Sequence, residues 1–208
     1  MVCDWKDLES QILELSARIE NGEKAASPFP LLLLTSSSPL QRKAAETWAN
    51  DKCPASAALP QLPRRDKPEK IRIGYFSPDF RDHPVAFLTA ELFETHDRSR
   101  FELTAFSFGP NTNDDMRKRL EAAFDRFIDV RTLSARDIAL LSRKLEIDIA
   151  VDLAGFTHNS RPEVFAARLP GSSERWVRAL EAGDAPPPEP GLVWCDINAP
   201  RLFAWRRR

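Results

Sequence analysis

The segment with the most chemical potential is 78–84, which reads Pro-Asp-Phe-Arg-Asp-His-Pro. An apolar run precedes it, and Pro84 directly follows His83, where proline favours the first position of a helix. His83 therefore lies where the amide groups of a helix N-terminus point outward. Because this positive end of the helix dipole disfavours the imidazolium, we expect a neutral ring that can act as a base or hydrogen-bond acceptor. The competing interpretation is an exposed loop histidine without a chemical role.

A second polar segment, 152–158, reads Asp-Leu-Ala-Gly-Phe-Thr-His. Gly155 permits another group to approach the backbone closely, and Thr157 and His158 add polar side chains. The segment fits a plain turn equally well, with Asp152 capping the neighbouring amides. The residues by themselves leave both interpretations open.

Several common kinds of site are missing from the sequence. It contains neither G-x-G-x-x-G nor G-x-x-x-x-G-K-[ST], so we expect no dinucleotide site and no P-loop. It also lacks G-x-S-x-G, and its cysteines Cys3, Cys53 and Cys195 form no CxxC pair. This spacing argues against a disulfide framework, a zinc site and a cysteine nucleophile. We expect neither a cofactor nor a metal.

The elements that must position these segments alternate along residues 71–169. Strands are expected at 71–77, 102–109, 127–130 and 147–153, and helices at 84–94, 114–124, 134–146 and from about 162. Strand and helix alternating at this spacing predict an α/β fold, a Rossmann-like parallel sheet with flanking helices. Ligands bind such sheets beyond the carboxyl ends of the strands, where both polar segments lie. Four strands make a small sheet, so we expect one uncovered edge.

Three regions flank this lobe. Residues 1–53 are expected to form a helical arm, because apolar residues recur at helical spacing from Leu8 to Ile19. Residues 54–70 contain four prolines and are typical of an extended linker. Residues 170–208 show no apolar periodicity and are expected to form an irregular or disordered tail.

Charge and hydropathy narrow the choice of partners. Thirty Lys and Arg stand against 31 Asp and Glu, for a formal net charge of -1. Nucleic acid or an anionic membrane surface requires clustered positive charge, so we expect neither as a partner. The longest aliphatic run, Leu31–Leu34, is far shorter than the ~20 residues that span a bilayer, and we expect a cytoplasmic protein.

Several blocks, in the right order along the chain, closely resemble the bacterial SPINDLY-like family of O-linked N-acetylglucosamine transferases. They are Cys3–Trp5, Ile71–Phe80 with His83-Pro84, Phe127–Asp129 and Asp148–Thr157. The resemblance runs from about Val2 to Leu169. It implies the first lobe of a two-lobed GT-B glycosyltransferase, which the family precedes with tetratricopeptide repeats. Such an enzyme moves N-acetylglucosamine from UDP-GlcNAc to Ser or Thr hydroxyls of protein acceptors without a metal.

The resemblance also implies site residues. The histidine of the family's Asp-Phe-x-x-His motif falls on His83, which is the expected catalytic residue. The family's Asp-Leu-x-Gly-His-Thr motif falls on 152–157, where Phe156 replaces the histidine. The expected substrate contacts are Asp79, Pro84, Gly155 and Thr157.

After Leu169 the resemblance ends in a stretch rich in Arg, Pro and Trp. This change suggests a shifted reading frame or a truncated gene, with genuine divergence as the other explanation. We therefore expect a fragment that lacks the lobe holding UDP-GlcNAc and is inactive alone. The alternative is a non-catalytic protein-interaction module built on the same lobe. Apolar surface on the cleft face and in the tail predicts self-association.

Overall fold

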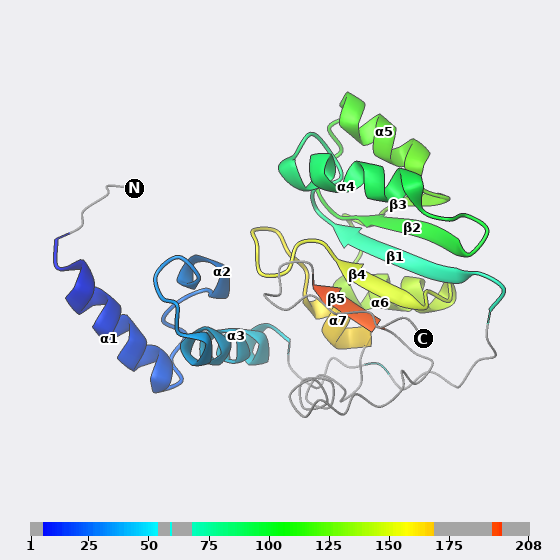
Figure 1. The fold of residues 1–208 in the computed structure, drawn as a ribbon. Coiled ribbons are helices and arrows are strands. Elements are labelled where there is room, and N and C mark those ends of the chain that lie inside the picture. Colours follow the sequence, from blue (N-terminus) through cyan, green and yellow to red (C-terminus); the bar gives the residue numbers. More distant parts are fainter. Residues whose placement is uncertain (1–5, 54–58, 60–67, 169–192, 197–208) are drawn as a thin grey trace, which may run out of the picture. The chain divides into compact units, whose positions relative to one another are not determined.

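A computed structural model describes residues 6–53, 59 and 68–168, together with the backbone of 193–196 (Figure 1). The chain divides into two compact units, Met1–Ser56 and Ala57–Arg208. The first unit is helical and the second contains the sheet.

The helical unit consists of α1 (Leu8–Glu20), α2 (Pro28–Leu31) and α3 (Ser38–Lys52). Its buried core contains Ile19, Leu31, Leu40 and Ala44. The hydroxyl of Ser37 accepts from the Leu40 amide and caps α3. The single turn of α2 differs from the sequence prediction, which places no helix there. Two of its four residues are proline, which usually argues against a helix. The first turn tolerates proline because its amides have no partner within the helix.

The sheet unit alternates strands with helices, as predicted. Its elements are β1 (Ile71–Ser77), α4 (Pro84–Thr95), β2 (Phe101–Ser107), α5 (Asp115–Ala123), β3 (Arg126–Asp129), α6 (Ala135–Lys144), β4 (Ile149–Asp152), α7 (Glu163–Arg168) and β5 (Val193–Asp196). The strands lie in the order β3-β2-β1-β4-β5, and every neighbouring pair is parallel. This arrangement confirms the predicted parallel Rossmann-like sheet with flanking helices.

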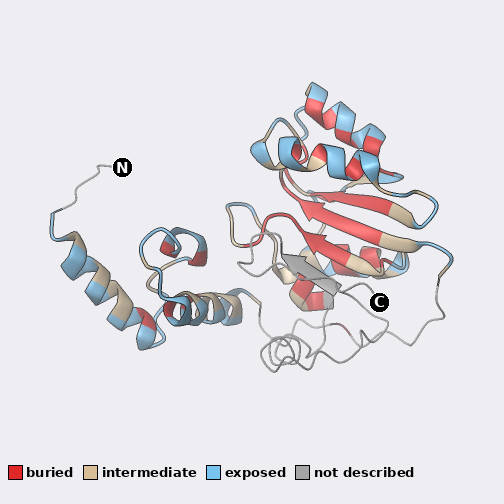
Figure 2. Cartoon of the chain, in the orientation of Figure 1, coloured by how far each residue is buried: buried red, intermediate tan, exposed pale blue. Residues whose placement is uncertain are grey.

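Helices cover both faces of this sheet (Figure 1). The α4 and α5 helices pack against Ile73, Tyr75 and neighbouring strand residues on one face. The α6 and α7 helices pack against Phe76, Phe106 and their neighbours on the other. Successive side chains of a strand thus enter opposite cores, the period of two that a strand buried on both faces requires. Figure 2 shows the buried strands between helices whose outer sides are exposed.

The fifth strand corrects the prediction that residues 170–208 are irregular throughout. Val193–Asp196 pairs in parallel with β4, from Ile149↔Val193 to Asp152↔Asp196. An edge strand leaves a row of unpaired backbone groups, and β5 satisfies that row on β4. A run of four residues between prolines and charges is too short to show a period, which is why the pattern did not reveal it. The rest of this segment lies outside the described residues.

The segment 54–70, predicted to be a linker, has one residue firmly in the sheet unit. Leu59 is 2% exposed and belongs to the core beneath α6 and α7. Its amide donates to the Ala167 carbonyl at 2.9 Å. The core of the sheet unit therefore includes a residue that precedes β1. In the part of the chain that the structure describes, every helix is too short or too polar to cross a bilayer.

Candidate functional site

The topology predicts a crevice between the carboxyl ends of β1 and β4. From β1 the chain winds outward to β2 and β3, and then returns to the other side of β1 to form β4. Ligands bind α/β sheets at such a reversal of winding. Phe76 of β1 pairs with Asp152 of β4, so the loops that follow these strands leave the sheet at the same level. They are the two polar segments singled out in the sequence.

The β1–α4 loop, residues 78–83, holds Asp79 by contacts within itself. The Asp79 amide donates to the Ser77 hydroxyl at 2.9 Å. Nη2 of Arg81 donates to the Asp79 carboxylate at 3.3 Å. The Asp79 side chain is only 13% exposed. The second carboxylate oxygen lies 3.7 Å from Nδ1 of His83. The structure therefore brings Asp79 and His83 together at the sheet edge.

His83 is the N-cap of α4. Its Nδ1 accepts a hydrogen bond from the Val85 amide at 3.3 Å, while about a third of the side chain remains exposed. A ring nitrogen that accepts carries no proton, so in the neutral ring the proton resides on Nε2. The ring can thus donate from Nε2, whereas the sequence predicts a base or an acceptor. Pro84 begins the helix beside it and is exposed.

The loop that follows β2 supports the β1–α4 loop from the side. The Phe108 amide donates to the Ser77 carbonyl at 3.2 Å. Gly109 lies so close to Pro78 that a Cβ atom there would be 1.7 Å from the Pro78 carbonyl oxygen. Only glycine permits this approach of two backbones. The side of the crevice nearest β2 is therefore closely packed.

Polar groups in the first turn of α5 also reach this loop, and the sequence prediction missed them. Arg117 is 3% exposed, and its Nη1 donates to the Phe80 carbonyl at 3.3 Å and to the Ser107 hydroxyl at 2.9 Å. Asp114 caps α5 by accepting from the Arg117 amide at 2.7 Å. The Thr112 hydroxyl first, and the amides of Arg117 and Asp82 to a smaller extent, lower the pKa of Asp114 to about 2. A usable signal was present, since Arg117 lies beside Met116 on the apolar side of this helix.

The β4–α7 loop, residues 153–162, is shaped by turns. The buried Asp152 carboxylate accepts from the Ala154 amide at 2.9 Å. The hydroxyl of Thr157 donates to the Ala154 carbonyl at 2.6 Å, and the Thr157 amide donates to the same oxygen at 3.0 Å. Gly155 has φ +54°, in the left-handed region that glycine favours. Asp152 thus caps a neighbouring amide, while Gly155 and Thr157 lie at the β4 side of the crevice.

Two further features concern metals and pockets. Among the residues that the structure describes, no three His, Cys, Asp or Glu side chains are grouped so that they could hold a metal ion.

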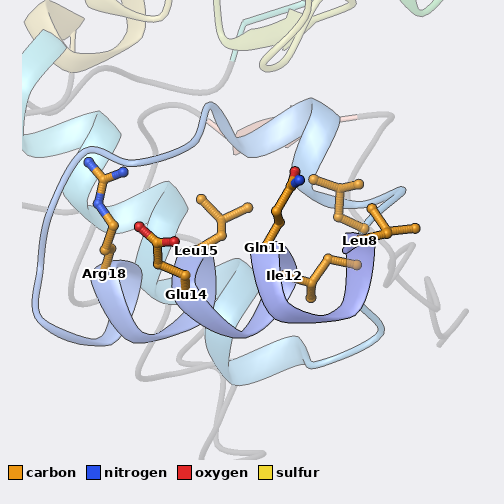
Figure 3. A pocket seen from close by; sticks show the side chains of 7 residues that line it. Leu8, Gln11, Ile12, Glu14, Leu15 and Arg18 are labelled. Carbon is orange, nitrogen blue, oxygen red and sulfur yellow. The ribbon is translucent and has the colours of Figure 1, made fainter. Parts of the chain in front are cut away.

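An apolar pocket lies in the helical unit, where α1 contributes Leu8, Ile12 and Leu15 and the following segment contributes Leu34 (Figure 3). This pocket involves none of the loop residues at the sheet edge.

Comparison with known proteins gives a consistent result. Residues 2–177 match glycosyl transferase family 41, so the match continues past Leu169. The probable UDP-N-acetylglucosamine–peptide N-acetylglucosaminyltransferase SEC of Arabidopsis thaliana is 34% identical over 98 residues, which are 47% of this chain and 10% of that protein. The UDP-N-acetylglucosamine–peptide N-acetylglucosaminyltransferase of Caenorhabditis elegans is 30% identical over 112 residues, or 52% of this chain and 10% of that protein.

A solved structure is also similar. A mutant of the Thermobaculum terrenum O-GlcNAc transferase superimposes with a TM-score of 0.62 at 29% sequence identity. The match covers 78% of this chain and 33% of that one. The chain spans about a tenth of the length of the two curated relatives.

Proposed function

The chain belongs to glycosyl transferase family 41, and from that premise we propose that its sheet unit is one lobe of a GT-B glycosyltransferase. The reaction proposed is transfer of N-acetylglucosamine from UDP-GlcNAc to Ser or Thr hydroxyls of protein acceptors. The names of the Arabidopsis and C. elegans relatives, which specify a peptide acceptor and this donor, support the choice of substrates. The family resemblance read from the sequence blocks is confirmed by the family match.

The observation that carries the proposal is the position of His83. It lies in the loop that leaves β1, beside the point where the winding of the sheet reverses. A ring held by the Val85 amide in the first turn of a helix is fixed before any substrate arrives. Fixed groups of this kind contribute to catalysis because no reorganisation is needed during the reaction.

His83 is proposed to touch the reacting groups through Nε2. The acceptor oxygen bonds to C1 of the sugar as the bond from C1 to the diphosphate oxygen of UDP breaks, and the hydroxyl proton passes to the departing diphosphate, on which negative charge develops. The proton on Nε2 suits donation to an oxygen of either substrate. Removal of the hydroxyl proton by the same nitrogen would require the other tautomer, which the Val85 amide opposes.

The remaining substrate contacts are proposed on the two sides of the crevice. Pro84 is exposed at the start of α4 and can contact a ligand directly. Asp79 is mostly buried, so it would act mainly by shaping the loop, in which its carboxylate accepts from Arg81. Gly155 is buried, so it would shape the β4 side of the crevice through its left-handed φ of +54°. The Thr157 hydroxyl already donates to Ala154, which leaves it to accept a hydrogen bond from the ligand.

The nucleotide is proposed to bind a second lobe, because the described loops carry no phosphate-binding glycine motif. The 208-residue chain alone should therefore neither bind UDP appreciably nor transfer the sugar.

Self-association also stays a proposal. Exposed apolar side chains on α4, namely Phe87, Leu88 and Leu92, support it.

The test is a chimera in which residues 57–168, which include the core residue Leu59, replace the matching lobe of the Thermobaculum terrenum transferase. Transfer of labelled GlcNAc to an acceptor peptide should be measurable in the chimera. His83→Ala should lower kcat by about 10²-fold, the usual effect of removing one donor that stabilises developing charge. UDP binding, which belongs to the other lobe, should be unchanged and would confirm that the protein is assembled.

The matched control is His158→Ala, which removes an exposed histidine from the opposite loop. It should change kcat by less than about twofold, as surface substitutions away from a site usually do. A chimera that binds UDP but transfers nothing would contradict the proposed function. Equal kcat with and without His83 would show that this residue has no catalytic role.

A further inference from the structure

Arg117 is a buried charged residue that the proposed chemistry does not use. It lies on α5 among the apolar side chains of Met116 and Leu120 and is 3% exposed. A guanidinium in such a place is costly unless its donors are satisfied. Its position in the core therefore needs partners that hold it there.

Those partners join three parts of the sheet edge. Nη1 of Arg117 donates to the Phe80 carbonyl and to the Ser107 hydroxyl at the end of β2. Nε donates to Glu121 one turn later, at 2.7 Å. The guanidinium carbon is 4.3 Å from the centre of the Phe127 ring, a cation–π distance. One side chain thus connects α5 and β2 to the middle of the β1–α4 loop.

The same turn of α5 reaches the loop again, closer to His83. The backbone amide of Asp82, the residue before His83, is among the groups that lower the pKa of the Asp114 carboxylate, so the two lie near one another. Asp114 is itself oriented by its bond to the Arg117 amide and by the Thr112 hydroxyl. The loop is consequently held at Phe80, and the Asp114 carboxylate lies near Asp82 on the same side.

We propose that Arg117 is a positioning residue, which holds the β1–α4 loop through the Phe80 carbonyl and so fixes His83 beside the β1–β4 crevice. Without the guanidinium, the Phe80 carbonyl and the Ser107 hydroxyl lose a buried donor. The loop then gains freedom, and the alignment of the His83 ring with the Val85 amide is lost for part of the time. The inference rests on the proposed function only in treating His83 as the reacting group.

The experiment uses the 208-residue chain labelled with ¹⁵N and compares Arg117→Gln with Arg117→Lys. Two NMR measurements report the position of His83. The chemical shifts of the ring nitrogens identify the tautomer, and the hydrogen-exchange rate of the Val85 amide reports its hydrogen bond to Nδ1. In Arg117→Gln we expect Val85 exchange to be at least about tenfold faster relative to the Tyr75 amide of β1, because only the loop opens. The ring nitrogens should shift toward a mixture of tautomers.

Arg117→Lys should restore part of the difference, because an ammonium can still donate to the Phe80 carbonyl or the Ser107 hydroxyl but lacks the separate Nε donor to Glu121. Arg119→Gln is the matched control. Arg119 lies two residues along the same helix, is exposed and pairs with Glu94. It should leave the ratio of Val85 to Tyr75 exchange within about twofold of wild type, as a surface change does.

The inference fails if Val85 and Tyr75 exchange rise by the same factor, because Arg117 would then support only the whole fold. It also fails if the His83 ring signals do not change. If Arg117→Gln does not fold, Ser107→Ala serves instead, since it removes one bond to Nη1 and keeps the charge. Ser107→Ala must then raise the ratio of Val85 to Tyr75 exchange and shift the His83 ring signals, both by less than is expected for Arg117→Gln. None of these signals depends on transfer activity, so an inactive chimera would refute the proposed function without touching this inference.

Discussion

The two loops that border the crevice are held in different ways. The β1–α4 loop is tied to distant parts of the chain: Phe80 is buried, and Arg117 donates to its carbonyl. The β4–α7 loop is tied to the core at its start, where the amide of the buried Leu153 donates to the Phe76 carbonyl at 3.0 Å. Beyond Leu153 it is shaped mainly by bonds between near neighbours: the Ala154 amide donates to Asp152, and the Thr157 hydroxyl donates to the Ala154 carbonyl. Its tie to a neighbouring loop comes later, where Arg161 donates to the Leu133 carbonyl at 2.8 Å.

This difference indicates a division of labour. A loop anchored in the core can present a side chain such as His83 in one fixed orientation, as catalysis requires. A loop built from local turns presents backbone, and its shape depends on a few special dihedral angles such as that of Gly155. Substitutions in the first loop should therefore act through packing, and substitutions in the second through backbone strain.

Phe80→Ala should have the largest effect and would break the anchor of the first loop. The Phe80 ring makes edge contacts with Phe93, Phe124 and Phe127 in the core. Its removal should lower the free energy of unfolding by about 3–5 kcal/mol, the usual range for a buried phenylalanine. Urea denaturation followed by circular dichroism measures this change.

Phe87→Ala is the control for this substitution. Phe87 lies on α4 with 59% of its surface exposed. Truncating an exposed ring should change stability by no more than about 0.5 kcal/mol. If both substitutions had the same cost, the β1–α4 loop would not be anchored by Phe80, and the contrast between the loops would disappear.

The sequence was sufficient to predict most of this framework. The apolar run of β1 and the helical spacing of apolar residues in α5 and α6 come from burial, which leaves a pattern in the sequence that is visible without coordinates. The helix start at Pro84 was visible for a local reason, because proline and an N-cap act within one turn. Strand ends shifted by a few residues, since backbone pairing and not composition decides where a strand stops.

Other features could not be predicted because they depend on contacts between distant segments. The bond from Arg117 to Phe80 joins residues 37 positions apart, and nothing local to either residue specifies it. The β5 strand likewise exists because β4 offers an open edge. The donor character of Nε2 in His83 required the observed bond from the Val85 amide to Nδ1.

Gly155→Ala should have an intermediate effect and sharpens the description of the second loop. An alanine at φ +54° is strained by about 1–2 kcal/mol, because its Cβ approaches the carbonyl oxygen. Asn159→Ala is the matched control: Asn159 has φ +62° in the same loop and is exposed. Its cost should have the same sign and be smaller, since asparagine already bears part of the strain. A cost for Gly155→Ala as large as that of Phe80→Ala would mean that the second loop is anchored as firmly as the first.

Asp114→Asn should have the smallest effect, and its dependence on pH identifies the cause. Asparagine is an equally good N-cap, so the substitution removes the charge and keeps the cap. The pKa of Asp114 is about 2 in the folded chain, below its ordinary 3.8, so the unfolded chain binds more protons between these values. The carboxylate therefore stabilises the fold fully above pH 3.8, and this contribution is lost as the pH falls through 2.

The variant should accordingly be slightly less stable than wild type at pH 6 and approach it at pH 2. Urea midpoints at pH 6, 3 and 2 measure this convergence, and high salt should weaken it because Asp114 is partly exposed. Asp115→Asn removes an equal charge from the same turn, but the Asp115 side chain is fully exposed and pairs only with Lys118 among the contacts seen for it. If both variants lost the same stability at every pH, the Asp114 carboxylate would act only through the general charge of α5. A difference confined to Asp114 would instead place the charge in the support of the β1–α4 loop, since the Asp82 amide of that loop helps to lower the pKa of Asp114.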